Sequence, residues 1–208
     1  MGTAGSASLF GDTQVANTQA PFGFRPIRRQ DGAAWSSNFT QCKAQNNAGA
    51  MNRGDVVKQL ADGTVAIAAA ADGHLCRGVF DGCHYLLAAL GYNIWTNYWP
   101  GSGAIGLVDV FLIDDPLVVY EAQANAGTIT LADIGANADI VVNASTTGFS
   151  KMALGAPTTT GSTNFPWKIL ALGNNGVFIS DGYDATANFN IVEVVWNDMF
   201  MKGPAIGI

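Results

Sequence analysis

The sequence predicts an all-β protein, an antiparallel β-sandwich or barrel of jelly-roll-like type with an extended N-terminal arm and little helix. Short apolar runs alternate with Gly, Asn and Asp turn signals along most of the chain. Glycine occurs 25 times, whereas the helix-forming residue Glu occurs only at Glu121 and Glu193. Hydrophobic residues make up 49% of the 208 positions and charged residues 12%, a composition that favours a sizeable core and a charge-poor surface.

Residues 1–22 are predicted to form the arm, and residues 23–208 the β-rich body. Small and polar residues dominate the arm, and Phe10 is one of its few large apolar side chains. A segment of this composition buries too little surface to fold alone, so we expect it to gain contacts on a neighbouring subunit. Phe22 and Phe24 then anchor the chain to the body.

The body begins with a hairpin signal. Val56–Leu60 and Thr64–Ala68 are joined by an Asp-Gly turn, which is typical of a β-hairpin. Leu75–Phe80 and Cys83–Leu87 flank a second Asp-Gly pair. The sequence allows two interpretations of this pair, a tight hairpin turn or a bulge within one strand.

Further strands are predicted after residue 100. The apolar runs Val108–Ile113 and Leu117–Ala122 flank Asp114-Asp115-Pro116, which indicates two strands joined by a sharp corner, because proline cannot donate a ladder hydrogen bond. Thr130 and Asp133 have the spacing of a capping box, so a short helix is predicted there. The other expectations are long loops or an edge hairpin over residues 143–166, and closing strands at Trp167–Leu172 and Asn190–Trp196.

The net charge of −6 is unevenly distributed. Residues 1–60 carry six Lys or Arg against three Asp, and residues 61–208 carry four against thirteen acids. Arg25, Arg28 and Arg29 form too thin a basic cluster to predict direct nucleic-acid binding. No apolar run approaches the length of about 20 residues that spans a bilayer, so no membrane partner is expected.

The chain offers few groups for catalysis. Its only histidines are His74 and His84, and neither lies in a signature of nucleophilic catalysis. The GxGxxG match at residues 101–106 is not followed by a helical pattern, as a dinucleotide site requires. We therefore expect no enzymatic activity, no catalytic residue and no cofactor.

The three cysteines, Cys42, Cys76 and Cys83, are an odd number and predict free, mostly buried thiols. His74, Cys76, Cys83 and His84 have soft-metal ligand types, but neither a hairpin nor a single strand would gather all four around zinc, so no metal site is expected. The sequence does not decide whether a structural calcium is bound. Its candidate ligands are four carboxylates: Asp109, Asp114, Glu121 and Asp133.

The blocks RGVFDGC, TNYWP and IDDP, the last followed by VVYEAQ, occur in this order between Arg77 and Gln123. Over roughly residues 78–140 the chain resembles the head decoration, or cement, proteins of tailed bacteriophages. The resemblance implies a structural virion protein, made in the host cytoplasm, that binds the outside of the shell. Its implied partners are the major capsid protein and further copies of itself, as a homodimer or homotrimer.

Aromatic and basic side chains are the interface candidates. The basic stretch suits an acidic shell surface, and exposed aromatic residues are enriched at protein interfaces. The alternative function is a carbohydrate-binding module of tail-fibre or lectin type, with Trp95, Tyr98 and Trp99 as a stacking platform. The predicted interface residues are Phe10, Phe22, Phe24, Arg25, Arg28, Arg29, Trp95, Tyr98 and Trp99.

Overall fold

The computed structural model describes residues 17–36, 38–125, 127–145, 147–158, 165–173 and 188–201. Within these ranges the protein is nearly all β, as predicted, with short 3-10 turns at Gly73–Leu75 (η1) and Leu131–Asp133 (η2). The strands are β1 (Arg25–Arg29), β2 (Thr40–Ala44), β3 (Met51–Asn52), β4 (Val56–Gln59), β5 (Val65–Ile67), β6 (Cys76–Leu86), β7 (Asn93–Thr96), β8 (Tyr98–Trp99), β9 (Val108–Ile113), β10 (Val118–Gln123), β11 (Asn137–Val141), β12 (Ala153–Thr158), β13 (Trp167–Leu172) and β14 (Ile191–Trp196).

The first half of the chain forms a closed barrel. Its strand order is β4-β5-β2-β9-β6-β7, and a further pairing of β4 with β6 closes the ring. β2 and β5 pair in parallel, and the other pairs are antiparallel. Side chains alternate along β9, so that Val108, Val110 and Leu112 are buried inside the barrel while Asp109 and Phe111 face outward.

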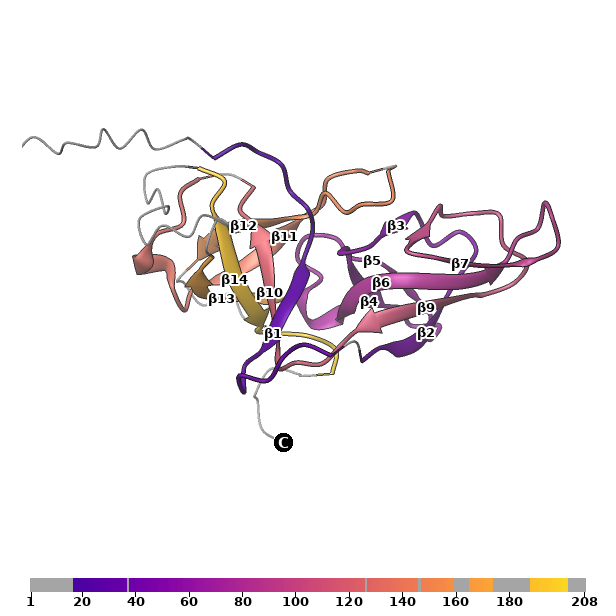
Figure 1. The fold of residues 1–208 in the computed structure, drawn as a ribbon, viewed down its shortest axis with the longest axis horizontal. Helices are drawn as coiled ribbons and strands as arrows, with labels where there is room; N and C mark the ends of the chain where they lie inside the picture. Colours follow the sequence, from indigo (N-terminus) through magenta and orange to yellow (C-terminus); the bar gives the residue numbers. More distant parts are fainter. Residues whose placement is uncertain are drawn as a thin grey trace, which may run out of the picture.

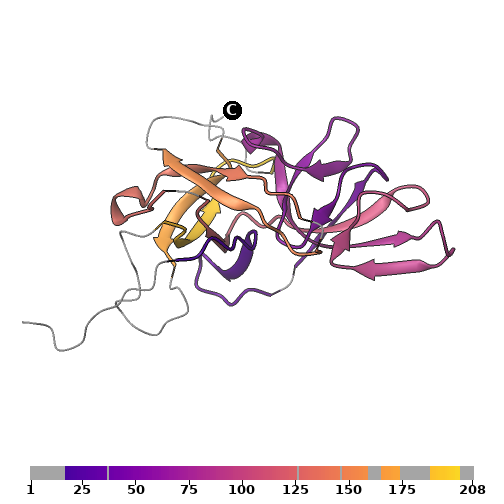
Figure 2. The same cartoon turned by 90° about the horizontal axis from the view of Figure 1, so that it is seen from above.

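The second half, together with β1 from near the start of the chain, forms an antiparallel sheet in the order β1-β10-β14-β13-β11-β12. Barrel and sheet lie side by side along the longest axis of the molecule (Figures 1 and 2). They share a core, because Val56, Val79 and Ile113 of the barrel belong to the same buried cluster as Trp167 and Trp196 of the sheet. The two halves are therefore packed into one elongated body.

The alternatives left open by the sequence are resolved. Residues 81–82 lie within the single long strand β6, whose pairing with β9 shifts between Phe80 and Gly82, so the Asp-Gly pair is a bulge and not a hairpin turn. The hairpin of β4 and β5 is confirmed. β12 is an edge strand of the sheet and lies within residues 143–166, the stretch predicted as loops or an edge hairpin, whereas its partner β11 precedes that stretch. At η2, Thr130 and Asp133 make the expected capping box around a single 3-10 turn.

Strand β1 is absent from the sequence prediction. It contains Pro26 and three arginines, a composition that gives no strand signal. Its pairing with β10 is irregular between Pro26 and Arg28, and β1 lies at the edge of the sheet, where a missing N–H is tolerated. Ion pairs with residues far along the chain hold it there.

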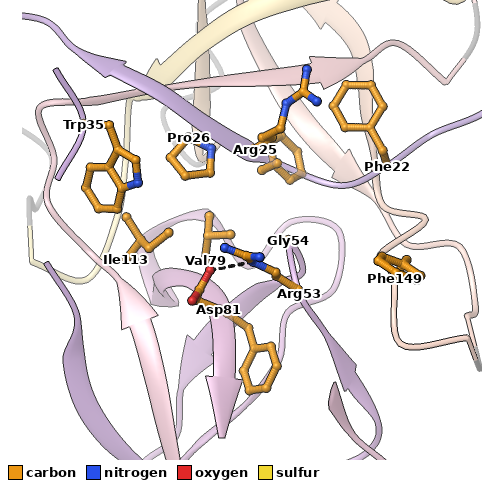
Figure 3. Close-up of a pocket in the computed structure, with 12 residues that line it drawn as sticks. Phe22, Arg25, Pro26, Trp35, Arg53, Gly54, Val79, Asp81, Ile113 and Phe149 are labelled. Carbon is orange, nitrogen blue, oxygen red and sulfur yellow. Dashed lines mark hydrogen bonds and ion pairs between the residues drawn. The ribbon is translucent and has the colours of Figure 1, made fainter. Parts of the chain in front are cut away.

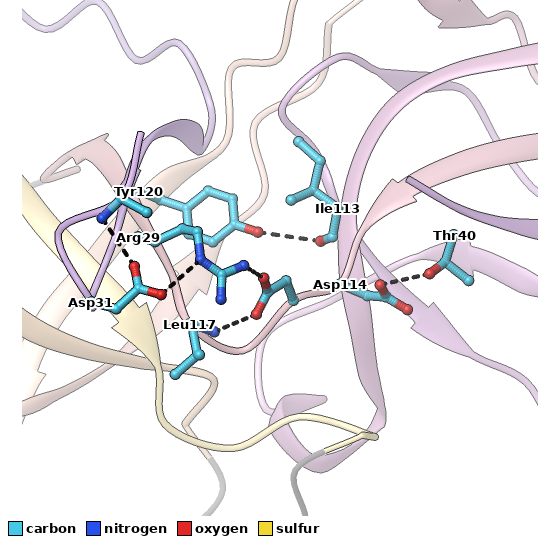
Figure 4. Close-up of polar contacts among 9 residues, drawn as sticks. Arg29, Asp31, Thr40, Ile113, Asp114, Leu117 and Tyr120 are labelled. Carbon is cyan, nitrogen blue, oxygen red and sulfur yellow. Dashed lines mark hydrogen bonds and ion pairs between the residues drawn. The ribbon is translucent and has the colours of Figure 1, made fainter. Parts of the chain in front are cut away.

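The chain crosses from the barrel to the sheet at the corner between β9 and β10 (Figure 4). The Asp114 carboxylate holds the barrel side of this corner. It accepts a hydrogen bond from the Thr40 hydroxyl at 2.8 Å, and its other oxygen lies 3.5 Å from a guanidinium nitrogen of Arg77. Both partners belong to barrel strands.

The Asp115 carboxylate holds the sheet side. One oxygen accepts the Leu117 N–H at 2.9 Å, which fixes the turn into β10, and the other oxygen pairs with Arg29 of β1. The Tyr120 hydroxyl reaches back from β10 and donates to the Ile113 carbonyl at 3.2 Å. Adjacent carboxylates thus bind different halves of the molecule.

Replacing Asp115 by alanine is expected to destabilise the whole fold. Asp115→Ala removes the acceptor for a turn N–H and the partner of Arg29, which together are expected to lower the free energy of unfolding by at least about 1 kcal/mol in urea titrations. The matched control is Asp31→Ala, which removes a second partner of Arg29 that is half exposed and belongs to a local turn. A loss for Asp31→Ala as large as that for Asp115→Ala would contradict this role.

Candidate functional site

A cavity of about 580 Å³ lies where β1 passes the barrel (Figure 3). Its walls are mostly apolar. The Arg53–Asp81 ion pair, with Nε 2.7 Å from Oδ1, is the main polar feature, and Phe149 at one side is 69% exposed. The cavity therefore suits an apolar side chain. Its lining residues are Phe22, Phe24, Arg25, Pro26, Trp35, Arg53, Gly54, Val79, Phe80, Asp81, Ile113 and Phe149.

The three predicted interface arginines are paired within the chain. Arg25 pairs with Glu121, Arg28 with Glu193, and Arg29 with both Asp31 and Asp115. The hydrogen bond that Arg29 donates to Asp31, followed by the negative charge of Asp115 and Asp31, raises the pKa of Arg29. The arginines line one edge of the sheet, but local carboxylates already balance their charge.

Two of the predicted interface residues belong to the core. Phe24 is 0% exposed and stacks on Trp167 with ring centroids 4.4 Å apart. The positive φ of 79° at Gly23 turns the chain inward there, and a Cβ at this position would lie 2.5 Å from Ser150. Trp99 is likewise 0% exposed. The prediction that these two side chains meet a partner is therefore corrected.

The described end of the arm lies on its own sheet. Asn17 donates from its amide to the Asn190 side chain at 2.8 Å, and the Ala20 N–H donates to Gln123 at 2.8 Å. Phe22 lies under the Arg25 guanidinium, 5.2 Å from the ring centroid. These contacts place residues 17–22 on the body, whereas Phe10 lies outside the described residues.

The predicted aromatic trio does not come together. Tyr98 is half buried in the short strand β8, and Trp99 packs against Tyr85 inside the barrel. Trp95 instead stacks with two side chains that the sequence did not connect with it, His84 at 4.2 Å and Phe111 at 5.5 Å between ring centroids. Their link comes from the pairing of β6 with β7 and β9, which no local pattern reveals.

A polar network lies beside these rings on the outer barrel face. Asp109 accepts hydrogen bonds from the Gln41 amide at 2.6 Å and from the Lys43 ammonium, and the His84 Nδ1 lies 3.7 Å from its second oxygen. Burial alone would raise the pKa of Asp109, but the hydrogen bonds from Lys43, Gln41 and His84 outweigh burial and hold that pKa below its ordinary value.

The candidate metal ligands do not gather at one place within the described residues. Cys76 lies in the shared core and Cys83 inside the barrel, and burial raises the pKa of both thiols, to about 12 for Cys83. All three cysteines are free, as predicted. The four candidate calcium ligands each have separate local partners, and no group of three or more His, Cys, Asp or Glu that could hold a metal forms within the described ranges.

Large apolar side chains are exposed at both ends of the body. At the barrel end, the hairpin between β6 and β7 pairs with the loop before β9 through Ala88 N–H to Gly103 O at 2.8 Å. These two loops expose four large apolar side chains: Leu90, Tyr92, Ile105 and Leu107. The 3-10 turn η2 lies at the opposite end of the body (Figure 1). There Leu131 and the residue that follows the turn, Ile134, are exposed. We call these sets the barrel-end patch and the sheet-end patch.

Comparison with known proteins finds no matching family model, curated protein or solved structure. Within the part of the chain that the structure describes, no helix has the length and hydropathy to cross a membrane. The interaction surfaces therefore have to be interpreted from their own chemistry.

The acid network around Asp109 predicts a pH dependence. The folded-state pKa of Asp109 is lowered, so its ionised form contributes stability above the unfolded value of about 3.9, and this contribution is lost as the pH falls through the folded-state pKa. Carboxyl NMR titration is expected to give a midpoint below the ordinary value. In Lys43→Met, which loses one donor, the midpoint should move back upward. A wild-type midpoint at or above the ordinary value would contradict the network.

Proposed function

We propose that this protein is a structural virion protein that binds the outer surface of a tailed-bacteriophage capsid and cements the shell. The proposal rests on one observation above all: an elongated body exposes apolar patches at both ends. A molecule of this shape contacts two neighbours at once and resists their separation. The resemblance over roughly residues 78–140 supports the same role.

The apolar patches are suited to binding protein. The barrel-end patch gathers four large side chains on two loops that are hydrogen bonded to each other, so it is presented on a fixed backbone. Large apolar side chains exposed together on neighbouring loops are a feature of interaction sites on proteins. Only 12% of the residues are charged. Few charged side chains would therefore have to lose their hydration when the protein packs against a shell.

Mechanical function requires that force pass between the two ends. The barrel is a closed ring of hydrogen-bonded strands, and it shares a buried core with the sheet. Many such bridges on one shell act together, so each subunit needs only modest affinity to raise the resistance of the particle. A symmetric homodimer or homotrimer would add further contacts between copies.

The arm supports this role by joining neighbouring copies. Asn17 and Ala20 are hydrogen bonded to Asn190 and Gln123, which places residues 17–20 of the arm on the body. This segment carries Phe10, and the apolar cavity beside β1 offers a receptor of matching chemistry on the next copy. The arm would then connect subunits without any change in the body.

The bridging role predicts different effects for binding and stabilisation. A double substitution in either patch, Leu90→Ser with Ile105→Ser or Leu131→Ser with Ile134→Ser, is expected to leave some co-sedimentation with expanded capsids that lack the protein. It should, however, remove the protection of those capsids against heat, because the remaining patch binds but no longer bridges.

The control for both double variants is Phe39→Ser, which removes an exposed aromatic side chain from the segment that joins β1 to β2. Full protection is expected in this control. Full protection in both patch variants, or no binding of the wild-type protein to capsids at any salt concentration, would overturn the proposal.

The arm is tested by Phe10→Ser against Gln14→Ser, a change in the same segment that removes no apolar surface. Phe10→Ser is expected to lower the oligomer content in sedimentation velocity and to weaken capsid protection, and Gln14→Ser to change neither. Equal behaviour of Phe10→Ser and the wild-type protein in both assays would remove the arm from the account.

A further inference from the structure

We infer that the outer face of the barrel carries a binding site for a neutral sugar ring, centred on Trp95. This surface lies outside the two apolar patches, and the inference does not depend on the capsid role. It replaces the platform of Trp95, Tyr98 and Trp99, because Trp99 is buried.

The site is a straight row across four strands. Trp95 of β7 is the cross-strand partner of His84 of β6, His84 is the partner of Asp109 of β9, and Asp109 is the partner of Lys43 of β2. Residues that pair in this way point to the same face of a sheet. Gln41 lies on the same face, two residues before Lys43.

The aromatic half of the row provides a stacking surface. Trp95 is 69% exposed although it stacks with both His84 and Phe111, so most of the indole faces solvent in a fixed orientation. In the neighbouring position of β6, Gly82 has no side chain to cover the rings. The electron-rich face of an indole attracts the weakly positive C–H groups of a pyranose ring, and a fixed ring loses little entropy on binding.

The polar half provides hydrogen bonds at the edge of that surface. A lysine ammonium has three donors and a carboxylate about four acceptor sites, which is more than Lys43 and Asp109 use on each other. Gln41 adds an amide to the same cluster. Sugar hydroxyl groups both donate and accept, so they fit a cluster that contains a carboxylate, an amide and an ammonium group.

The charge of the row favours a neutral ligand. The positive charge of Lys43 and the negative charge of Asp109 are paired, so the row offers no excess charge to a phosphate backbone or to an acidic peptide.

Tryptophan fluorescence tests the site directly. Of the chain's five tryptophans, Trp99, Trp167 and Trp196 are buried, Trp35 is half buried and only Trp95 is exposed. The probes are cello-, malto-, xylo-, laminari- and galacto-oligosaccharides at millimolar concentration. At least one is expected to saturate with a Kd of about 1 mM or lower and to protect Trp95 from acrylamide quenching.

Variants separate the site from other surfaces. By calorimetric titration, Trp95→Ala is expected to weaken binding of that oligosaccharide about tenfold or more, and Asp109→Asn to weaken it by less. The matched control is Phe149→Ala, because Phe149 is also 69% exposed but lies beside the cavity at β1. Circular dichroism checks that each variant is folded.

Saturable binding that is lost in Trp95→Ala and kept in Phe149→Ala supports the site. Absence of saturable binding to every probe, or binding that persists in Trp95→Ala, overturns it. If no probe binds and Trp95→Ala instead loses co-sedimentation with capsids, the row is a protein contact and the sugar site is wrong. If the protein does not bind capsids but does bind an oligosaccharide through Trp95, only the capsid proposal is wrong. The two proposals are therefore tested independently.

Discussion

The structure depends most on the corner where the chain leaves the barrel and enters the sheet. Two adjacent carboxylates there hold different halves of the molecule, Asp114 through Thr40 and Arg77, and Asp115 through Arg29 and the turn backbone. The two carboxylates have different partners, which makes them unsuitable for shared acid–base chemistry but suitable for joining the barrel to the sheet. The geometry that argues against catalysis at this corner is therefore the geometry that holds the fold together.

The corner between β9 and β10 and the shared core explain how the exposed surfaces of barrel and sheet are arranged. Because the barrel and the sheet share buried residues, the exposed groups at their far ends keep a fixed separation. The outer barrel face is equally constrained, since its aromatic and polar side chains come from strands of a closed ring. The proposed role as a bridge on a shell uses this arrangement, because it needs separate contact surfaces on one packed body. Burial raises the pKa of the Cys76 and Cys83 thiols.

Local signals in the sequence were sufficient for much of the fold. The strands on either side of Asp114-Asp115-Pro116 were predicted to within one residue, because turn chemistry is a property of adjacent residues. Strand β1 was missed because carboxylates distant in sequence hold it. The aromatic site was missed for a similar reason: Trp95 and Trp99 have the spacing of one strand face, but β7 ends before β8 begins, so one is exposed and the other buried. His84 and Phe111 become its neighbours only through sheet pairing.

Differential scanning calorimetry of the wild-type protein tests most directly whether the corner and the shared core unite barrel and sheet. A single heat-absorption peak is predicted, with a calorimetric enthalpy equal to the van't Hoff enthalpy, because neither half can lose its packing without the other. Two resolved transitions, or a van't Hoff enthalpy well below the calorimetric value, would show that barrel and sheet unfold separately. That result would contradict a body that transmits force from one end to the other.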